Sequence, residues 1–307
     1  MWRRYPTRMV TDSFKEARLR RRDFLTGAAG LAGGALLPSW ALANVPTPFT
    51  FDLVPPMDSR ENFIKWGVAQ RGEDPQYLGE RFDRFVALVR NEDIWDDRHK
   101  RAFLFTPREK FVLQQNLSRA YEHAFLDIGW GVTISGPHIV GRMTSTIDPK
   151  MGEKVLEVGT GSGYQSAYLS HLTDQVFTIE IIKPLAERTR ATYDSLIKDG
   201  YAEFSAIKSK NADGYYGWEE NAPFDKIIVT CGIDHVPPPL LQQLKPNGVM
   251  VIPVGPPGAQ RVLKVVKNQA DDGTITVARS DIYGGRIVPF VPFTKLEGDA
   301  IKGTHNN

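Results

Sequence analysis

The sequence has a single cysteine, Cys231, in 307 residues. One thiol cannot form an intramolecular disulfide, and it cannot provide the several cysteine ligands of a structural zinc site. His171 and His235 have no partner at the spacing of metal ligands either, so we predict no metal site. The fold must therefore be stabilised by an apolar core, for which a hydrophobic fraction of 41% is ordinary.

The chain also lacks a surplus of charge of one sign. Residues 1–43 hold eight basic and three acidic side chains, which leaves 30 Lys and Arg against 33 Asp and Glu in the remainder. The remainder therefore has a formal net charge of −3. A partner that is recognised through a basic surface, such as a nucleic acid, is not expected.

The apolar run over residues 24–37 is shorter than the roughly 20 residues that a membrane-spanning helix needs. It follows RRDFL at residues 21–25, which has the twin-arginine pattern, and Pro38 ends it. Residues 41–43 (ALA) have the small-x-small form of a cleavage site. We therefore predict that residues 1–43 are a twin-arginine signal for export to the periplasm. The alternatives are a signal retained as a membrane anchor, an unused signal in a cytoplasmic protein, and an ordinary amphipathic helix.

From residue 153 onward, strand and helix patterns alternate. The predicted strands are 154–158, 175–180, 202–207, 224–230 and 249–254, followed by a hairpin of 261–268 and 275–282, and the predicted helices are 162–171, 183–198 and 239–244. This alternation predicts an α/β fold with a mostly parallel sheet, helices on both faces and antiparallel strands at one edge. Before it, residues 44–60 are rich in proline like a linker, and residues 61–121 have a helical pattern.

The segment VLEVGTGSGYQ (residues 155–165) predicts a strand, a glycine turn and the start of a helix. Its glycines have G-x-G-x-G spacing, whereas the dinucleotide fingerprint is G-x-G-x-x-G with a pyrophosphate at the helix start. Glu157 stands two residues before the first glycine, where a carboxylate would repel a pyrophosphate and attract a cation. S-adenosylmethionine, with a sulfonium, an ammonium and a ribose diol but no phosphate, suits such a turn.

Two further acidic positions follow predicted strands. Glu180 ends the second strand, where a carboxylate can accept hydrogen bonds from a ribose diol, and Asp213 with Gly214 follows the third, near the place of an adenine edge. Ligands of open α/β sheets bind outside the carboxyl ends of the strands, so these groups are predicted to converge with Glu157. The alternative is that each is an ordinary exposed acid.

Six segments, in this order and spacing, resemble the protein-L-isoaspartate O-methyltransferase family. They are PREKFV (107–112), GVTISGPHIVGRMT (131–144), VLEVGTGSGYQ (155–165), ADGYYGW (212–218), APFDKIIVT (222–230) and LKPNGVMVIPV (244–254). The resemblance implies a seven-stranded Rossmann-like methyltransferase sheet, S-adenosylmethionine as donor, and an isoaspartyl residue of a protein or peptide as acceptor. It divides the chain into the signal, a linker with an extra helical region (44–97), a methyltransferase domain (98–295) and a tail (296–307).

The resemblance also implies the site residues. Thr133 and Ser135 belong to the Thr-Ile-Ser element beside donor and acceptor; the cofactor-binding residues are Glu157, Gly159, Thr160, Gly161, Ser162, Gly163, Glu180, Asp213 and Gly214. An ionised carboxylate is already a nucleophile, so methyl transfer needs positioning and exclusion of water rather than a general base. We expect Ser135 to be a positioning group; the alternative is a cap of the helix that begins near Pro137.

The acceptor side departs from the family pattern. Val132 and Gly136 flank the Thr-Ile-Ser element in place of Gln or Ala, and CGIDH at residues 231–235 replaces a small, alanine-rich stretch. Two hypotheses follow. The first is an exported carboxyl methyltransferase that acts on isoaspartyl or related carboxylates of proteins; the second is a non-catalytic accessory or binding subunit of a periplasmic or membrane complex.

Overall fold

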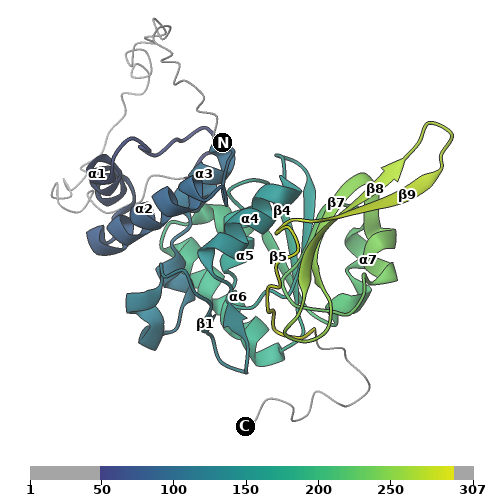
Figure 1. Cartoon of the computed structure of the whole chain (residues 1–307). Coiled ribbons are helices and arrows are strands. Elements are labelled where there is room, and N and C mark those ends of the chain that lie inside the picture. The colour runs from purple at the N-terminus through teal and green to yellow at the C-terminus, as the bar shows by residue number, and fades with distance from the viewer. Residues whose placement is uncertain (1–48, 294–307) are drawn as a thin grey trace, which may run out of the picture. The chain divides into compact units, whose positions relative to one another are not determined.

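A computed structural model describes residues 49–293 of the chain, and the predicted export signal and tail lie outside the described residues. Seven strands form the central sheet (Figure 1). In their order across the sheet they are β5 (Ile207–Asn211), β4 (Gln175–Glu180), β3 (Lys154–Val158), β6 (Phe224–Val229), β7 (Leu244–Val254), β8 (Arg261–Gln269) and β9 (Ile275–Asp281). The first five are parallel and the last two form an antiparallel hairpin, which confirms the predicted sheet.

The predicted third strand, 202–207, is wrong except for its last residue, since it shares only Ile207 with β5. Residues 202–206 form the 3-10 helix η4 (Ala202–Ala206), and β5 starts only at Ile207. The rings of Tyr201 and Phe204 stack with their centroids 5.5 Å apart. A 3-10 helix has three residues per turn and brings such side chains to the same side, whereas a strand would point them to opposite faces.

Helices cover both faces of the sheet, as predicted. The helices are α1 (Arg60–Arg71), α2 (Pro75–Arg90), α3 (Asp97–Phe105), α4 (Pro137–Ile147), α5 (Tyr164–Leu169), α6 (Lys183–Lys198) and α7 (Pro238–Gln243). Alternate residues of each strand point to opposite faces, so Val155 joins the core under α1–α6 and Leu156 joins the core on the side of α7. No helix within residues 49–293 is both long and apolar enough to cross a membrane.

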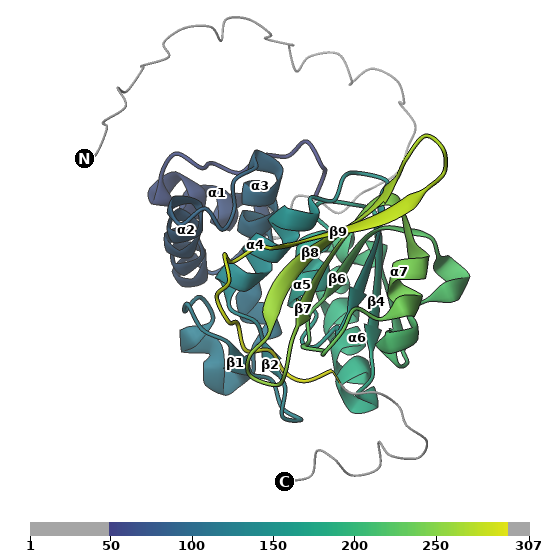
Figure 2. The ribbon, with the colours of Figure 1, turned by 45° about the vertical axis from the view of Figure 1, so that its right-hand side comes forward.

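The N-terminal helices α1–α3 lie together against α4 and α5 (Figure 2). Each begins with a side-chain cap, from Ser59, Asp74 and Asp96 respectively. Ahead of α1, the ring of Phe49 packs against His171, with centroids 4.7 Å apart. The N-terminal helices are therefore part of the same apolar core as the helices that cover the sheet.

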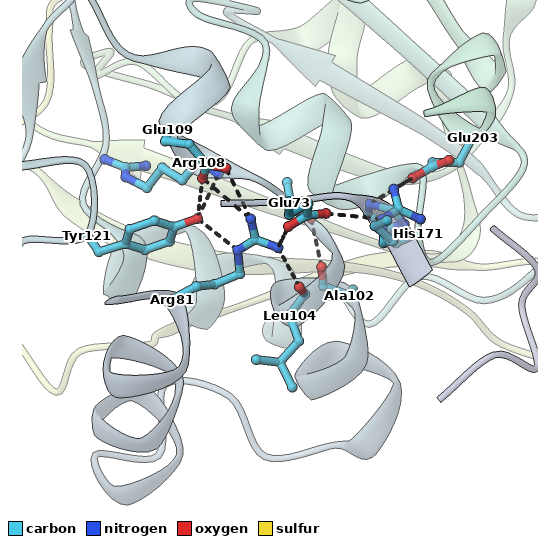
Figure 3. A network of polar contacts seen from close by, with 11 residues as sticks. Glu73, Arg81, Ala102, Leu104, Arg108, Glu109, Tyr121, His171 and Glu203 are labelled. Carbon is cyan, nitrogen blue, oxygen red and sulfur yellow. Dashed lines mark hydrogen bonds and ion pairs between the residues drawn. The ribbon is translucent and has the colours of Figure 1, made fainter. Parts of the chain in front are cut away.

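A buried network of charged side chains joins α1 and α2 to the rest of the domain (Figure 3). Arg71 contacts Glu73 at 3.1 Å and Glu203, in η4, at 3.0 Å. Arg81 contacts Glu73 at 2.7 Å and Glu109 at 3.2 Å. All five side chains are at most 5% exposed. Buried charges persist only when they are paired and hydrogen-bonded, and here each acid lies beside an arginine.

Candidate active site

A cavity of about 650 Å³ lies at the carboxyl ends of β3, β4 and β6. Its wall is built from three parts of the chain: the β1–β2 hairpin (Leu126–Asp127 and Thr133–Ile134) with the start of α4, the ends of the parallel strands, and residues 288–293. A smaller cavity, of about 40 Å³, lies beside it and shares Ser135 and Gly161 with it. The carboxyl edge of an open parallel sheet is where such folds bind ligands.

The glycine turn after β3 lines this cavity with backbone. Gly159, Gly161 and Gly163 have φ of 96°, 55° and 92°, which side chains other than glycine rarely allow. A Cβ on Gly159 would also lie 2.4 Å from Oγ1 of Thr230, whose hydroxyl donates to the Gly159 carbonyl at 2.6 Å. The turn therefore presents bare backbone to a ligand, which is what the glycine spacing predicts.

Glu180 stands at the end of β4 and lines the cavity. Its carboxylate accepts the N–H of Gly161 at 2.8 Å and the N–H of Ile182 at 3.0 Å. Burial raises the pKa of this carboxyl, and the two backbone donors oppose that shift. Within residues 49–293 it forms no salt bridge, so a ligand with a positive charge or hydroxyl donors would complete its partners.

Glu157 lies beneath the glycine turn rather than on the wall of the large cavity. Its side chain is fully buried and accepts hydrogen bonds from Ser166 and, at 2.7 Å, from Thr178. Burial, with a smaller contribution from the charge of Glu180, raises the pKa of Glu157 to about 8. The group is thus mostly a neutral acid at neutral pH. It lines the small cavity, and its contact with the cofactor stays a prediction.

Some of the other predicted cofactor residues line one of the two cavities, and others contact neighbouring parts of the chain. Gly214 lines the large cavity, and Thr160 and Ser162 line the small one. Asp213 is buried, and its carboxylate accepts the Tyr215 N–H at 2.9 Å and begins a short 3-10 helix. Gly163 faces Tyr193, whose hydroxyl donates to its carbonyl at 3.2 Å. The contact of Asp213 with a cofactor stays a prediction.

Thr133 and Ser135 both line the large cavity, at the end of the β1–β2 hairpin. The helix α4 begins at Pro137, its N-cap residue is Gly136, and no side chain caps it, so the alternative of Ser135 as a helix cap is wrong. The segment 288–293 lines the same cavity and is held by the Phe293 N–H, which donates to the Gly232 carbonyl at 2.7 Å. Ser135 thus shares this cavity with the glycine turn and the segment 288–293.

Two wall residues, His123 and His138, carry functional groups that the sequence did not assign to the site. They are fifteen positions apart and match no catalytic spacing, so only the fold brings them together. Cys231 also lines the cavity, and burial raises the pKa of its thiol well above the usual range. It is therefore not a ready nucleophile.

Comparisons with known proteins give the same family description for the family model and for similar relatives. A family model described as protein-L-isoaspartate(D-aspartate) O-methyltransferase (PCMT) matches residues 81–298. A protein-L-isoaspartate O-methyltransferase 2 of Polaromonas sp. is 45% identical over 221 residues, which are 69% of this chain and 98% of the relative. A protein-L-isoaspartate O-methyltransferase 2 of Shewanella sediminis is 41% identical over 231 residues, 75% of this chain and 88% of the relative.

Solved structures agree on the fold. One from Plasmodium falciparum, described as a protein-L-isoaspartate O-methyltransferase in complex with S-adenosyl-L-homocysteine, matches with a TM-score of 0.56 and 24% identity over 69% of this chain and 97% of its own. Another, titled protein-L-isoaspartate O-methyltransferase, has a TM-score of 0.57 and 26% identity over 69% of this chain and 65% of its own. The seven-stranded sheet is therefore the sheet of these enzymes.

Proposed function

This chain belongs to the protein-L-isoaspartate O-methyltransferase family, and from that premise we propose the reaction of its cavity: transfer of the methyl group of S-adenosylmethionine to the free carboxylate of an isoaspartyl residue in a protein. One observation carries the proposal. The glycine turn and the carboxylate of Glu180, which has no salt bridge within residues 49–293, line the same cavity as Ser135, so a donor site and an acceptor position are open to each other.

The residues present suit the donor. S-adenosylmethionine, when bound, supplies an electrophilic methyl group on a sulfonium. Glu180 offers an acceptor for hydroxyl groups of the donor, and the turn at Gly159 and Gly161 permits close approach of its backbone. A cationic ligand requires a carboxylate that is not already paired with a basic side chain. Within residues 49–293, no basic side chain pairs with Glu180.

The chain's part in the transfer is positioning. A carboxylate oxygen of the acceptor forms the new C–O bond as the C–S bond breaks, and the electron pair stays on sulfur, so no proton moves. Ser135 can donate a hydrogen bond that orients the acceptor, and residues 288–293 restrict the access of water. Because the chain only positions the reactants, the transfer needs no nucleophilic side chain, and the raised pKa of the Cys231 thiol agrees with this.

The test is methyl transfer from labelled S-adenosylmethionine to an isoaspartyl peptide, with the same peptide carrying a normal aspartate as control. We expect a base-labile methyl ester on the isoaspartyl peptide alone. Donor binding measured by calorimetry without any methyl ester would contradict the reaction and support the non-catalytic alternative.

We propose, as a separate step, that residues 1–43 export this enzyme to the periplasm. The support is the order of the twin arginines, the apolar run and the small-x-small site. Cell fractionation of the full chain against Arg21→Lys/Arg22→Lys tests it. We expect the unmodified chain in the periplasm or on the membrane and the variant in the cytoplasm; equal cytoplasmic location of both overturns the proposal.

A further inference from the structure

Two histidine rings are stacked on the wall of the cavity, and the mechanism above uses neither. The centroids of His123 and His138 are 3.6 Å apart and their planes differ by 8°. His138 lies in the first turn of α4, three residues after Ser135, and His123 lies just before β1. Both line the same cavity as Ser135, so they belong to the part of the wall where the acceptor is proposed to lie.

The space for the His138 ring comes from a missing side chain. A Cβ at Gly136 would lie 2.6 Å from Cε1 and 2.8 Å from Nδ1 of His138. The φ of Gly136 is −60°, a value open to any residue, so backbone conformation does not require glycine here. The departure from the family pattern at position 136 is therefore matched to the ring of His138.

His138 is held neutral by its surroundings. Burial, then the neighbouring His123 and the charges of Arg84, Arg108 and Arg142, lower the pKa of His138 to about 4. Its Nδ1 is enclosed and has no hydrogen-bond partner among residues 49–293. A proton on that nitrogen would be a buried donor without an acceptor, so the neutral ring carries its proton on Nε2.

Given the proposed function, we infer that His138 binds the acceptor: its neutral Nε2–H donates a hydrogen bond to the acceptor carboxylate, and His123 and Gly136 fix the ring in that position. A neutral donor orients the carboxylate and leaves the attacking oxygen its charge, whereas an imidazolium would form an ion pair and weaken the nucleophile. The uncapped start of α4 favours an anion at the same place.

Steady-state kinetics with an isoaspartyl peptide test the inference, with calorimetry of S-adenosylmethionine as the control for an intact donor site. His138→Phe removes the donor and keeps a flat ring, so KM for the peptide should rise roughly 10- to 100-fold while the donor affinity is unchanged. His138→Gln retains an N–H donor and should recover most of the loss. An unchanged peptide KM in His138→Phe overturns the inference.

Gly136→Ala gives a second variant that leaves both histidines in place. Its Cβ should displace the His138 ring and raise the peptide KM in the wild-type background, but not in His138→Phe, where the donor is already lost. Equal effects in both backgrounds contradict the role of Gly136. A wild type that binds S-adenosylmethionine but methylates no isoaspartyl peptide contradicts the proposed function itself, which separates the two failures.

The pH profile gives a readout that a merely structural histidine would not change. Because the pKa of His138 is about 4, its ring stays neutral at mildly acidic pH, and kcat should not fall there through protonation of His138. His123→Asp replaces a neighbour that lowers the pKa of His138 with a carboxylate, so this pKa should rise, although burial and the charges of Arg84, Arg108 and Arg142 still oppose protonation. The variant should then lose kcat at mildly acidic pH, and a profile identical to wild type overturns the role of the pair.

Discussion

The two buried acidic clusters of this protein differ in what balances their charge. In the network under α1 and α2, Glu73, Glu109 and Glu203 each contact Arg71 or Arg81 at 3.2 Å or less. At the cavity, Glu157 and Glu180 are just as buried, yet within residues 49–293 neither forms a salt bridge.

The difference separates a structural role from a binding role. A buried carboxylate needs a cation, a set of hydrogen-bond donors, or a proton. The network supplies arginines from the chain itself, so it requires no ligand. At the cavity, Glu157 holds a proton over much of the neutral range, and Glu180 relies on two backbone donors and has acceptor capacity left for a ligand. The first cluster holds the helices to the domain; in the proposed function, the second is completed by the donor.

The largest effect should come from breaking the paired cluster. Arg81→Met leaves Glu73 and Glu109 buried beside one arginine too few, which costs about 3–5 kcal/mol of the free energy of unfolding. Urea unfolding followed by tryptophan fluorescence measures it. Arg60→Met is the matched control, because its pair with Asp83 has side chains that are 51% and 63% exposed and should contribute little. Equal losses in the two variants would contradict the comparison.

Changing Glu180 at the cavity should instead weaken the binding of S-adenosylmethionine. Glu180→Ala removes an acceptor of the donor's hydroxyl groups, so the Kd of S-adenosylmethionine should rise roughly 10- to 100-fold. The free energy of unfolding should change less than in Arg81→Met, since no opposite charge is left unpaired. Calorimetry measures the affinity, with the exposed Glu187→Ala on α6 as control. An affinity equal to that of the control would remove Glu180 from the site.

The sequence predicts most of the sheet well because strands such as β3 and β4 are short, largely apolar runs bounded by turns. The bounds of β3, β4 and α6 agree with the prediction to the residue. The error at residues 202–206 arises because a local alternation was outweighed by the stacking of Tyr201 on Phe204. The local pattern identifies an element, whereas tertiary packing decides at which residue it begins.

At the site, the glycine turn is predictable because its backbone conformation is a local property. The environment of Glu157 is not, because its donors Ser166 and Thr178 come from α5 and β4 and only the fold encloses the carboxyl. The stack of His123 on His138 likewise depends on space left at Gly136. Residue identity names the chemistry that is available, and tertiary contacts decide which form of each group is present.

A smaller effect should follow from the proton on Glu157. Its folded-state pKa of about 8 is above its value in an unfolded chain, so no ionisation penalty applies at acidic pH, and stability falls as pH rises toward 8. Glu157→Gln mimics the neutral acid. It should be neutral near pH 4 and more stable than wild type above pH 8, by about 1–3 kcal/mol after allowance for relaxation. Urea unfolding at both pH values checks this; the opposite trend would contradict a raised pKa.

The smallest effect should appear in the alkylation rate of Cys231, because the charge of Glu180 influences the pKa of its thiol. Burial, and then the negative charge of Glu180, raise the pKa of this thiol. Glu180→Gln removes the charge, so the thiolate fraction and the rate of alkylation by iodoacetamide at fixed pH should rise by roughly a few-fold. Because Cys231 is the only cysteine, a single mass shift follows the reaction. Glu187→Gln should leave the rate unchanged. Equal rates in the two variants would mean that Glu180 is already protonated without a ligand, and the cavity would then hold two neutral acids in place of one neutral and one charged.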